Sequence, residues 1–192
     1  MRRSSFWIVG GVAAALIVSG FTWRLAAAEK SEFGDDFHYM PASDERQQKL
    51  DELVGKPMPP LSVDGWVNGE VKPEDMKGKV VIVDIWATWC GPCLASIPHN
   101  NKMNEELKKD GLVIVAICSS DRGQDDLAKV ITARKIGYSV CKDPDLKTEK
   151  AYNLSFYPTY IAVDRNGIVR AAGLRPDKIE EVVKALLAEK AK

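Results

Sequence analysis

The sequence carries no excess charge of either sign. Its 27 Lys and Arg residues balance its 27 Asp and Glu residues, so the formal net charge at pH 7 is zero. No basic cluster stands out after Arg2 and Arg3. Because nucleic acids are bound by concentrated Lys and Arg surfaces, we expect no nucleic acid among the partners of this protein.

Histidine is scarce, with only His38 and His99 in the chain. The sequence has one Cys-x-x-Cys pair, Cys90 and Cys93, and no second pair of this spacing. A structural zinc ion usually has four protein ligands, so a zinc site here would need two more. We therefore predict no bound metal and no other cofactor.

No uncharged apolar run reaches the ~20 residues of a membrane-spanning helix. The run nearest to that length, Phe6 to Phe21, follows Arg2 and Arg3 and precedes the small residues Ala26-Ala27-Ala28. A positive start, an apolar middle and a small-residue end are typical of a secretory signal peptide.

A membrane anchor remains the alternative for residues 1–28. Arg24 can extend its charged end toward the membrane surface, which would lengthen the apolar span and give a membrane tether at residues 6–28. With either a signal peptide or an anchor, the rest of the chain lies outside the cytoplasm, in a periplasmic or otherwise extracytoplasmic compartment.

The rest of the chain divides into a polar segment and one domain. Residues 29–53 have scattered charges without periodicity, which is typical of a linker. We expect the domain over residues 54–192 and see no internal repeat in it.

Apolar periodicity in this domain indicates an α/β fold. The runs Lys79–Trp86 and Leu112–Ile117 are nearly continuous, as in strands buried on both faces of a parallel sheet. Asn166-Gly167 is a strong hairpin signal. Helices are expected after Cys90, around 127–131, over 144–153 and from Pro176, with further strands at 138–141, 160–163 and 168–170. This order predicts a mixed sheet flanked by helices.

The segment Trp89-Cys90-Gly91-Pro92-Cys93 carries the chemistry. Cys90 lies where a helix is expected to begin, and the free amides and partial positive charge of a helix N-terminus favour a thiolate. Cys93 comes about one turn later on the same face, so the two sulfurs can close a small disulfide ring. A structural disulfide would gain little from so short a loop, which favours a redox role.

The same segment resembles a known family. Val83 to Cys93 looks like the active-site strand and helix of thioredoxin, and Tyr157-Pro158-Thr159 is similar to its cis-proline loop. The lead-in Val54-Gly55-Lys56-Pro57 resembles exported thioredoxin-like proteins of the TlpA/ResA type, as does the extra helix and strand over 124–143. The resemblance covers about residues 54–190 and implies a thioredoxin fold with an inserted helix–strand unit.

The resemblance also implies roles for the residues around the cysteine pair. Cys90 is expected to be exposed and nucleophilic, with Cys93 shielded, and Pro158 is expected to follow a cis peptide bond. Trp86 is expected in the core. The substrate-binding surface is expected to include Trp89, Gly91, Pro92, Tyr157, Pro158 and Thr159.

Asp84 is a departure from many exported members, which have asparagine at this position, whereas thioredoxin has aspartate. A carboxyl group in an apolar strand is desolvated, so its pKa should rise. Asp84 could then accept the proton of Cys93 when that thiol attacks a mixed disulfide. The alternative is a buried aspartate with a purely structural hydrogen bond.

Cys118 and Cys141 end successive expected strands, so a second disulfide between them is conceivable. Disulfide geometry is demanding, and we favour two buried free thiols.

Together these features predict an extracytoplasmic thiol–disulfide oxidoreductase. The Gly-Pro pair between the cysteines resembles thioredoxin and favours a reductase that acts by dithiol–disulfide exchange through Cys90 and Cys93. The resemblance implies exported proteins with disulfides as substrates, such as apocytochromes, and an upstream membrane electron donor.

Two other functions occur on this type of fold. A copper-binding or metal-delivery protein of the Sco type has a longer cysteine spacing and a distant histidine, and no histidine follows His99. A peroxidase of the peroxiredoxin type has a Pro-x-x-x-Thr-x-x-Cys pattern, which is absent before Cys90. The copper-binding protein remains the main alternative.

Overall fold

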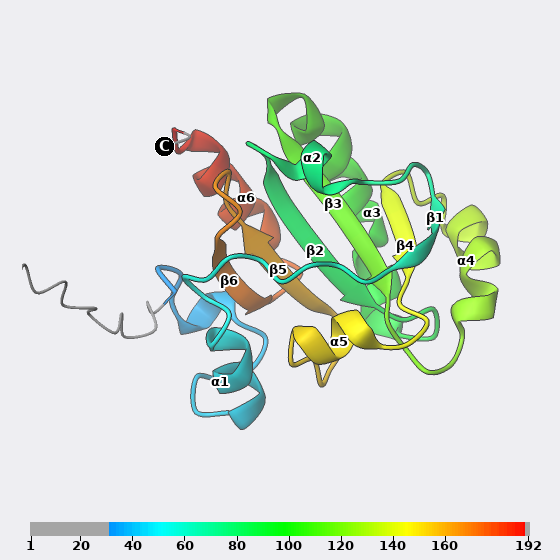
Figure 1. The fold of residues 1–192 in the computed structure, drawn as a ribbon, viewed down its shortest axis with the longest axis horizontal. Coiled ribbons are helices and arrows are strands. Elements are labelled where there is room, and N and C mark those ends of the chain that lie inside the picture. Colours follow the sequence, from blue (N-terminus) through cyan, green and yellow to red (C-terminus); the bar gives the residue numbers. More distant parts are fainter. Residues whose placement is uncertain (1–30, 191–192) are drawn as a thin grey trace, which may run out of the picture.

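The computed structural model describes residues 31–190, so the expected signal peptide or anchor at 1–28 lies outside the described residues. These residues form a mixed sheet with the strand order β1-β4-β3-β2-β5-β6 (Figure 1). The strands are β1 (Asp64–Val67), β2 (Val80–Trp86), β3 (Leu112–Cys118), β4 (Ser139–Lys142), β5 (Thr159–Val163) and β6 (Val169–Leu174).

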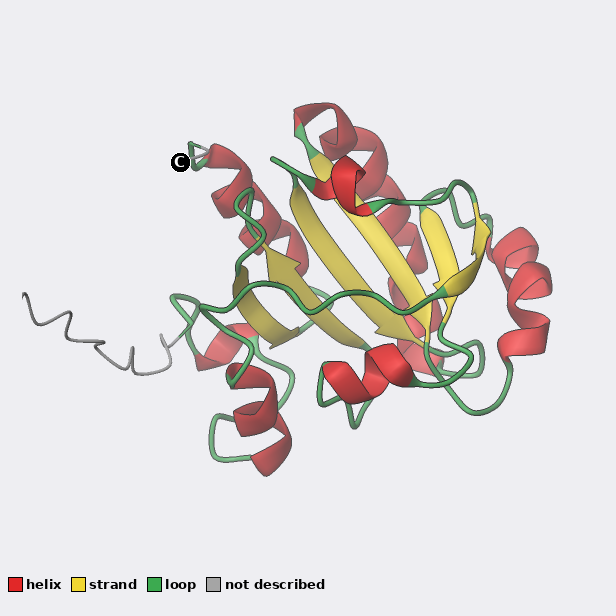
Figure 2. Ribbon diagram, viewed as in Figure 1, coloured by secondary structure: helices red, strands yellow, loops and turns green. Residues whose placement is uncertain are grey.

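Helices flank this sheet (Figure 2). They are α1 (Glu45–Asp51), α2 (Pro73–Met76), α3 (Gly91–Leu107), α4 (Leu127–Arg134), α5 (Lys147–Ala151) and α6 (Ile179–Ala188), with short 3₁₀ turns at Asp35–Phe37, Lys108–Asp110 and Gln124–Asp126. The predicted α/β fold with a mixed sheet between helices is confirmed.

Each face of the sheet packs against its own set of helices. α3, α4 and α6 contribute to the buried cluster on one face, while α1 and Tyr152, the residue after α5, contribute to the cluster on the other. Strand β2 lies between β3, to which it is parallel, and β5, to which it is antiparallel. Every residue of β2 is buried, which explains the nearly continuous apolar run in its sequence.

The segment between β3 and β5 contains α4 and β4, where the sequence predicted an inserted helix and strand. β4 pairs in parallel with the end of β3, and β1 pairs antiparallel with β4 at the edge of the sheet. The insertion therefore widens the sheet on the side away from β5, and the chain that leads into α4 leaves from the carboxyl end of β3.

Residues 31–53 pack against the domain, although the sequence suggested a linker over 29–53. Leu50 of α1 is fully buried, and an isolated backbone bridge joins His38 to Leu174 of β6. The N–H group of Tyr39 donates a hydrogen bond of 2.8 Å to the carbonyl of Gly173. Apolar residues are too few and too irregular here to produce a periodic pattern, so contacts with β6 determine the packing. The segment thereby covers backbone groups at an edge strand.

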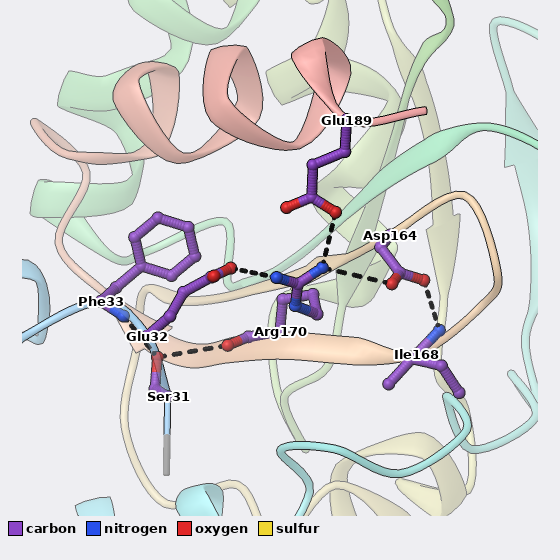
Figure 3. Close-up of polar contacts among 7 residues, drawn as sticks. All are labelled: Ser31, Glu32, Phe33, Asp164, Ile168, Arg170 and Glu189. Atoms are coloured by element: carbon purple, nitrogen blue, oxygen red, sulfur yellow. Dashed lines mark hydrogen bonds and ion pairs between the residues drawn. The ribbon is translucent and has the colours of Figure 1, made fainter. Parts of the chain in front are cut away.

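Arg170 of β6 holds the first described residues in place. Its guanidinium lies among the carboxylates of Glu32, Asp164 and Glu189 (Figure 3). The N–O distance to Glu189 is 2.8 Å, and the hydroxyl of Ser31 donates to the Arg170 carbonyl at 3.2 Å. One arginine thus connects the N-terminal segment, the turn after β5 and the end of α6.

Within residues 31–190, no helix combines the length and the apolar composition needed to cross a membrane.

Candidate active site

The cysteine pair lies where β2 passes into α3. β2 ends at Trp86, a short loop follows, and Cys90 is the N-cap residue of α3. Cys90 and Cys93 form a disulfide, and the N–H group of Cys93 donates to Cys90 Sγ at 3.2 Å. This amide is one of the free donors of the helix N-terminus, so it would stabilise a thiolate on Cys90 after reduction.

Both cysteines are buried in this disulfide form. Cys93 is 3% exposed, as expected, but Cys90 is only 5% exposed, so the expected exposure of Cys90 is wrong for this state. The reason is that Cys90 packs in the same buried cluster as Trp86 and Ala87. The exposed part of the motif is formed by its neighbours Trp89, Gly91 and Pro92.

The peptide bond between Tyr157 and Pro158 is cis, which confirms the prediction from sequence. Thr159 begins β5 and pairs with Ile85 near the end of β2, which brings the cis-proline loop to the end of the sheet that carries the cysteine pair. The side chain of Thr159 is fully buried, and its hydroxyl donates to the carbonyl of Phe156 at 2.7 Å. In this structure Thr159 therefore supports the loop with its side chain and does not present that side chain to solvent.

Trp89 forms the exposed rim of the site, as predicted, whereas Trp86 is in the core. Trp89 is 47% exposed, and its ring meets that of Tyr157 edge-on with centroids 5.9 Å apart. The guanidinium of Arg122 lies 4.5 Å from the Trp89 ring centroid, and Trp89 Nε1 donates to Ser120 Oγ at 3.1 Å. Contacts on several sides therefore hold an exposed aromatic ring beside the disulfide.

A loop that the sequence analysis did not identify holds the residues on both sides of the cysteine pair. We call residues 119–123, which follow β3, the clamp loop. The carbonyl of Ser119 accepts a hydrogen bond from the Tyr157 hydroxyl, and the carbonyl of Gly123 accepts one from the Thr88 hydroxyl at 2.8 Å. The clamp loop follows β3, a strand parallel to β2. Because functional sites often form at the carboxyl ends of parallel strands, this position in the sequence could have indicated the clamp loop.

A groove of about 390 Å³ lies beside the exposed face of Trp89. Its lining residues are Thr88, Trp89, Arg122, Gly123, Asp126, Lys129 and Val130. The groove thus joins the redox motif to the clamp loop and to the start of α4.

Asp84 is 4% exposed and lies in the middle of β2. Burial raises the pKa of Asp84 to about 7, and hydrogen-bonding groups of Asn100 and Tyr160 limit this rise. The amide of Asn100 donates to Asp84 Oδ2 at 3.1 Å, while Asp84 Oδ1 has no protein partner among the described residues. A carboxyl group with a pKa near neutral can both accept and release a proton at physiological pH.

Two further residues connect Asn100 to the cysteine pair. The Tyr160 hydroxyl lies 3.0 Å from Asn100 Nδ2 and 2.8 Å from Ser96 Oγ, and Ser96 Oγ donates to the carbonyl of Cys93 at 2.8 Å. Ser96, Asn100 and Tyr160 were not among the site residues predicted from the sequence. A sequence pattern could have indicated Ser96 and Asn100, because positions 93, 96 and 100 form a polar stripe on the buried face of a helix.

Cys118 and Cys141 are free and buried, as the sequence analysis favoured. Cys118 belongs to the same buried cluster as Cys90, whereas Cys141 belongs to the cluster on the other face of the sheet. Ile117 is the partner of Cys141 in the parallel register, so Cys118 and Cys141 are offset by one residue and point to opposite faces. Burial raises the pKa of Cys118 to about 11.

The chain is similar to known proteins in sequence and in structure. The Redoxin family matches residues 53–187. The chain is 27% identical over 116 residues to the thiol-disulfide oxidoreductase ResA of Bacillus cereus, covering 60% of this chain and 66% of that protein, slightly less than two thirds. It is 29% identical over 125 residues to ResA of Geobacillus kaustophilus, covering 64% of this chain and 70% of that protein.

Solved structures are similar over a larger share of their length. A Chlorobium tepidum protein described as a thiol:disulfide interchange protein DsbE has a TM-score of 0.63 and 32% identity, covering 70% of this chain and 98% of that one. A thiol-disulfide isomerase of Corynebacterium glutamicum has a TM-score of 0.62 and 26% identity, covering 70% of this chain and 97% of that one.

The sheet, the cysteine pair at a helix N-terminus and the cis-proline loop together define the class of thioredoxin-like thiol–disulfide oxidoreductases, to which this chain conforms. Within that class, the chain belongs to the Redoxin family.

Proposed function

We propose that this protein is an extracytoplasmic disulfide reductase that acts on exported proteins. The observation that carries the proposal is the Cys90–Cys93 disulfide at the N-terminus of α3, close to the cis-proline loop. The similarity to ResA and DsbE proteins supports the reaction type. The apolar N-terminal segment supports export, either with a cleaved signal peptide or with a tether at residues 6–28.

The reaction is a two-step exchange of thiols and disulfides. The Cys90 thiolate attacks one sulfur of a substrate disulfide, so a Cys90–substrate bond forms and the other substrate sulfur leaves as a thiolate. The Cys93 thiol then loses its proton to Asp84, and its sulfur attacks Cys90. The substrate leaves as a dithiol, and the protein keeps the oxidised pair. Two electrons have passed to the substrate, so an upstream donor dithiol must reduce the pair again.

The exposed surface around the pair supports a polypeptide substrate. Trp89 and Tyr157 provide aromatic contact area, and the groove beside Trp89 extends it along the clamp loop. The resemblance to thioredoxin implies that the loop around Pro158 binds the substrate backbone. Pro158 is itself buried, so we propose that a peptide segment on either side of the substrate disulfide lies across the exposed residues Trp89, Gly91 and Pro92 and against the backbone of the cis-proline loop.

The experiment that tests the proposal is a single-turnover reaction. The reduced protein is mixed with an oxidised exported protein, and substrate thiols are counted over time. We expect about two substrate thiols per oxidised Cys90–Cys93 pair, and none from a Cys90→Ser variant. A reduced protein that leaves every tested protein disulfide intact would contradict the proposed reductase.

Fractionation of cells that express the full chain tests the location and shows whether the N-terminal segment is cleaved.

A further inference from the structure

Asp84 is connected to the redox turn by an unbroken set of buried polar groups, which we call the buried chain. Its members are Asp84, Asn100, Tyr160, Ser96 and the carbonyl of Cys93. Each side chain in it is at most 7% exposed. Such a network is costly to bury unless its groups satisfy one another, so its presence in an otherwise apolar core needs an explanation.

The secondary structure brings these groups together from two directions. Asp84 and Tyr160 are direct partners in the antiparallel register of β2 and β5, so their side chains lie on the same face of the sheet. On α3, the spacing of positions 93, 96 and 100 places three residues on the helix stripe that covers this face. The buried chain therefore spans the interface between the sheet and the helix that carries the disulfide.

The direction of each hydrogen bond follows from the donors available. The Cys93 carbonyl can only accept, so Ser96 gives it the hydroxyl proton and must accept from Tyr160. Tyr160 therefore accepts from the amide of Asn100. The second N–H bond of that amide points to the carboxyl group of Asp84. Every donor hydrogen of the three middle residues is thus used once, and the hydrogen bonds run outward from the amide of Asn100, one way to Asp84 and the other way through Tyr160 and Ser96 to the Cys93 carbonyl.

We propose that Asn100, Tyr160 and Ser96 are positioning residues that hold the carboxyl group of Asp84 in the state that accepts the proton of Cys93. This inference rests on the proposed role of Asp84. A fixed amide hydrogen stabilises the carboxylate form, and Tyr160 fixes the amide of Asn100 because its hydroxyl accepts from the N–H bond that does not point to Asp84. Ser96 in turn fixes the Tyr160 hydroxyl and attaches the chain to the first turn of α3.

The other titratable groups around Asp84 are compatible with this role. Tyr160 from β5 and Tyr138 from the segment before β4 both have a pKa well above the ordinary range, chiefly because of burial, so both stay neutral near pH 7. Cys93 faces the same cluster from α3. Ala116 is the partner of Asp84 on β3. Desolvation and hydrogen bonds therefore control the proton affinity of Asp84, and the buried chain supplies those hydrogen bonds.

The test is a titration of the Asp84 carboxyl carbon by NMR in the full chain, in the parent and in Tyr160→Phe. Removal of the hydroxyl takes away a hydrogen-bonding group that lowers the Asp84 pKa and releases the amide of Asn100, so we expect the Asp84 pKa to rise by about one unit. Ser96→Ala breaks the chain one step further away and should give a smaller shift in the same direction. Unchanged titration of Asp84 in both variants would overturn the proposal.

Tyr152→Phe is the matched control. Tyr152 is also fully buried, and its hydroxyl donates to the carbonyl of Pro59 at 2.6 Å, but it lies in the cluster on the other face of the sheet. The Tyr152→Phe variant should be less stable than the parent, but the pKa of Asp84 should be unchanged in it. An equal shift in Tyr152→Phe and Tyr160→Phe would show a general effect of destabilisation and would also overturn the proposal.

Kinetics separates this inference from the proposed role of Asp84. The resolution step by Cys93 should slow about fivefold at pH 7 in Tyr160→Phe, because the carboxylate fraction falls from about one half to about one tenth. In an Asp84→Asn background, Tyr160→Phe should cause no further change in the pH profile. If Asp84→Asn alone leaves the pH profile unchanged, the role of Asp84 in the reaction fails, while the NMR titration still tests the buried chain.

Discussion

The carbonyl of Gly123 accepts a hydrogen bond of 2.8 Å from the hydroxyl of Thr88, two residues before Cys90. The two residues are 35 positions apart, and the contact fixes the strand-to-helix loop against the clamp loop. A Cβ atom on Gly123 would lie 2.3 Å from Thr88 Oγ1, and Gly123 has a φ of +82°. The clamp loop can therefore approach the redox motif this closely only with glycine at position 123.

We predict that Gly123→Ala destabilises the protein and slows its reaction with disulfides. The left-handed backbone costs roughly 1–2 kcal/mol with a side chain, and displacement of Thr88 adds roughly 1–3 kcal/mol. Gly78→Ala is the matched control, because Gly78 has a φ of +71° with nothing within 4 Å of a Cβ. Denaturant unfolding should show the larger loss in Gly123→Ala, and only that variant should react more slowly. Equal losses in the two variants would contradict the contact with Thr88.

Asp84 should make the protein less stable as pH rises from about 4 to about 7. Burial raises the pKa of Asp84 to about 7 in the folded protein, whereas an unfolded chain has a value near 3.9. In this window the folded state keeps a proton that the unfolded state has lost, so the free energy of unfolding falls with pH, by roughly 4 kcal/mol at most.

Asp84→Asn should remove this pH dependence and be more stable than the parent above pH 7. Urea unfolding of the parent and of Asp84→Asn between pH 4 and pH 8 measures the pH dependence of the free energy of unfolding. Asp143→Asn is the control, because Asp143 is fully buried but accepts hydrogen bonds from the Ser119 hydroxyl and from the N–H groups of Thr148 and Glu149. That substitution should destabilise the protein. A stability difference between parent and Asp84→Asn that does not grow with pH would refute the raised pKa.

Trp89→Ala should weaken the reaction with protein disulfides more than that with small ones. Trp89 is an exposed ring beside the pair, and aromatic anchors at interfaces often contribute 1–2 kcal/mol, so we expect about a tenfold loss in kcat/KM for a protein substrate. Trp89→Phe keeps an aromatic ring but loses the bond to Ser120, and it should lose less. Parallel assays with a protein and with a small aromatic disulfide check this. A similar loss for both substrates would count against a role in substrate binding.

The two remaining cysteines should behave as buried free thiols. Alkylation of the oxidised native protein should be slow, alkylation after denaturation should modify two thiols, and reduction before denaturation should raise this to four. Mass spectrometry of the alkylated protein gives these counts. Burial of Cys118 and Cys141 on opposite faces of the sheet is the physical reason. A Cys118–Cys141 peptide linked by a disulfide would contradict the fold.

Sequence patterns predicted those parts of the molecule that depend on near neighbours along the chain. The apolar run of β2 and the four-residue redox motif are local signals, and both have the secondary structure expected of them, a buried strand and the start of a helix. The cis bond before Pro158 was predicted from resemblance to a family and is confirmed.

The parts that were missed depend on contacts between distant residues. Ser96 and Tyr160 are 64 positions apart, so no local pattern reveals that their hydroxyls meet. The burial of Cys90 was missed because a position at a helix N-terminus does not indicate what packs around it. The packing of residues 31–53 depends on β6, more than a hundred residues later in the chain, as in the bond from Gln47 to the carbonyl of Ala172.

The most direct test of the account is a comparison of Cys93→Ser and Cys90→Ser as traps for substrates. In Cys93→Ser, Cys90 can still attack, but no thiol resolves the product, so mixed disulfides should accumulate, remain intact in non-reducing gels and disappear with reductant. Cys90→Ser should trap far fewer, because Cys93 is not the N-cap of α3, and the free amide that would stabilise a thiolate on Cys90 is the N–H group of Cys93 itself. Equal trapping by the two variants, or trapping by neither, would contradict the assignment of Cys90 as the nucleophile.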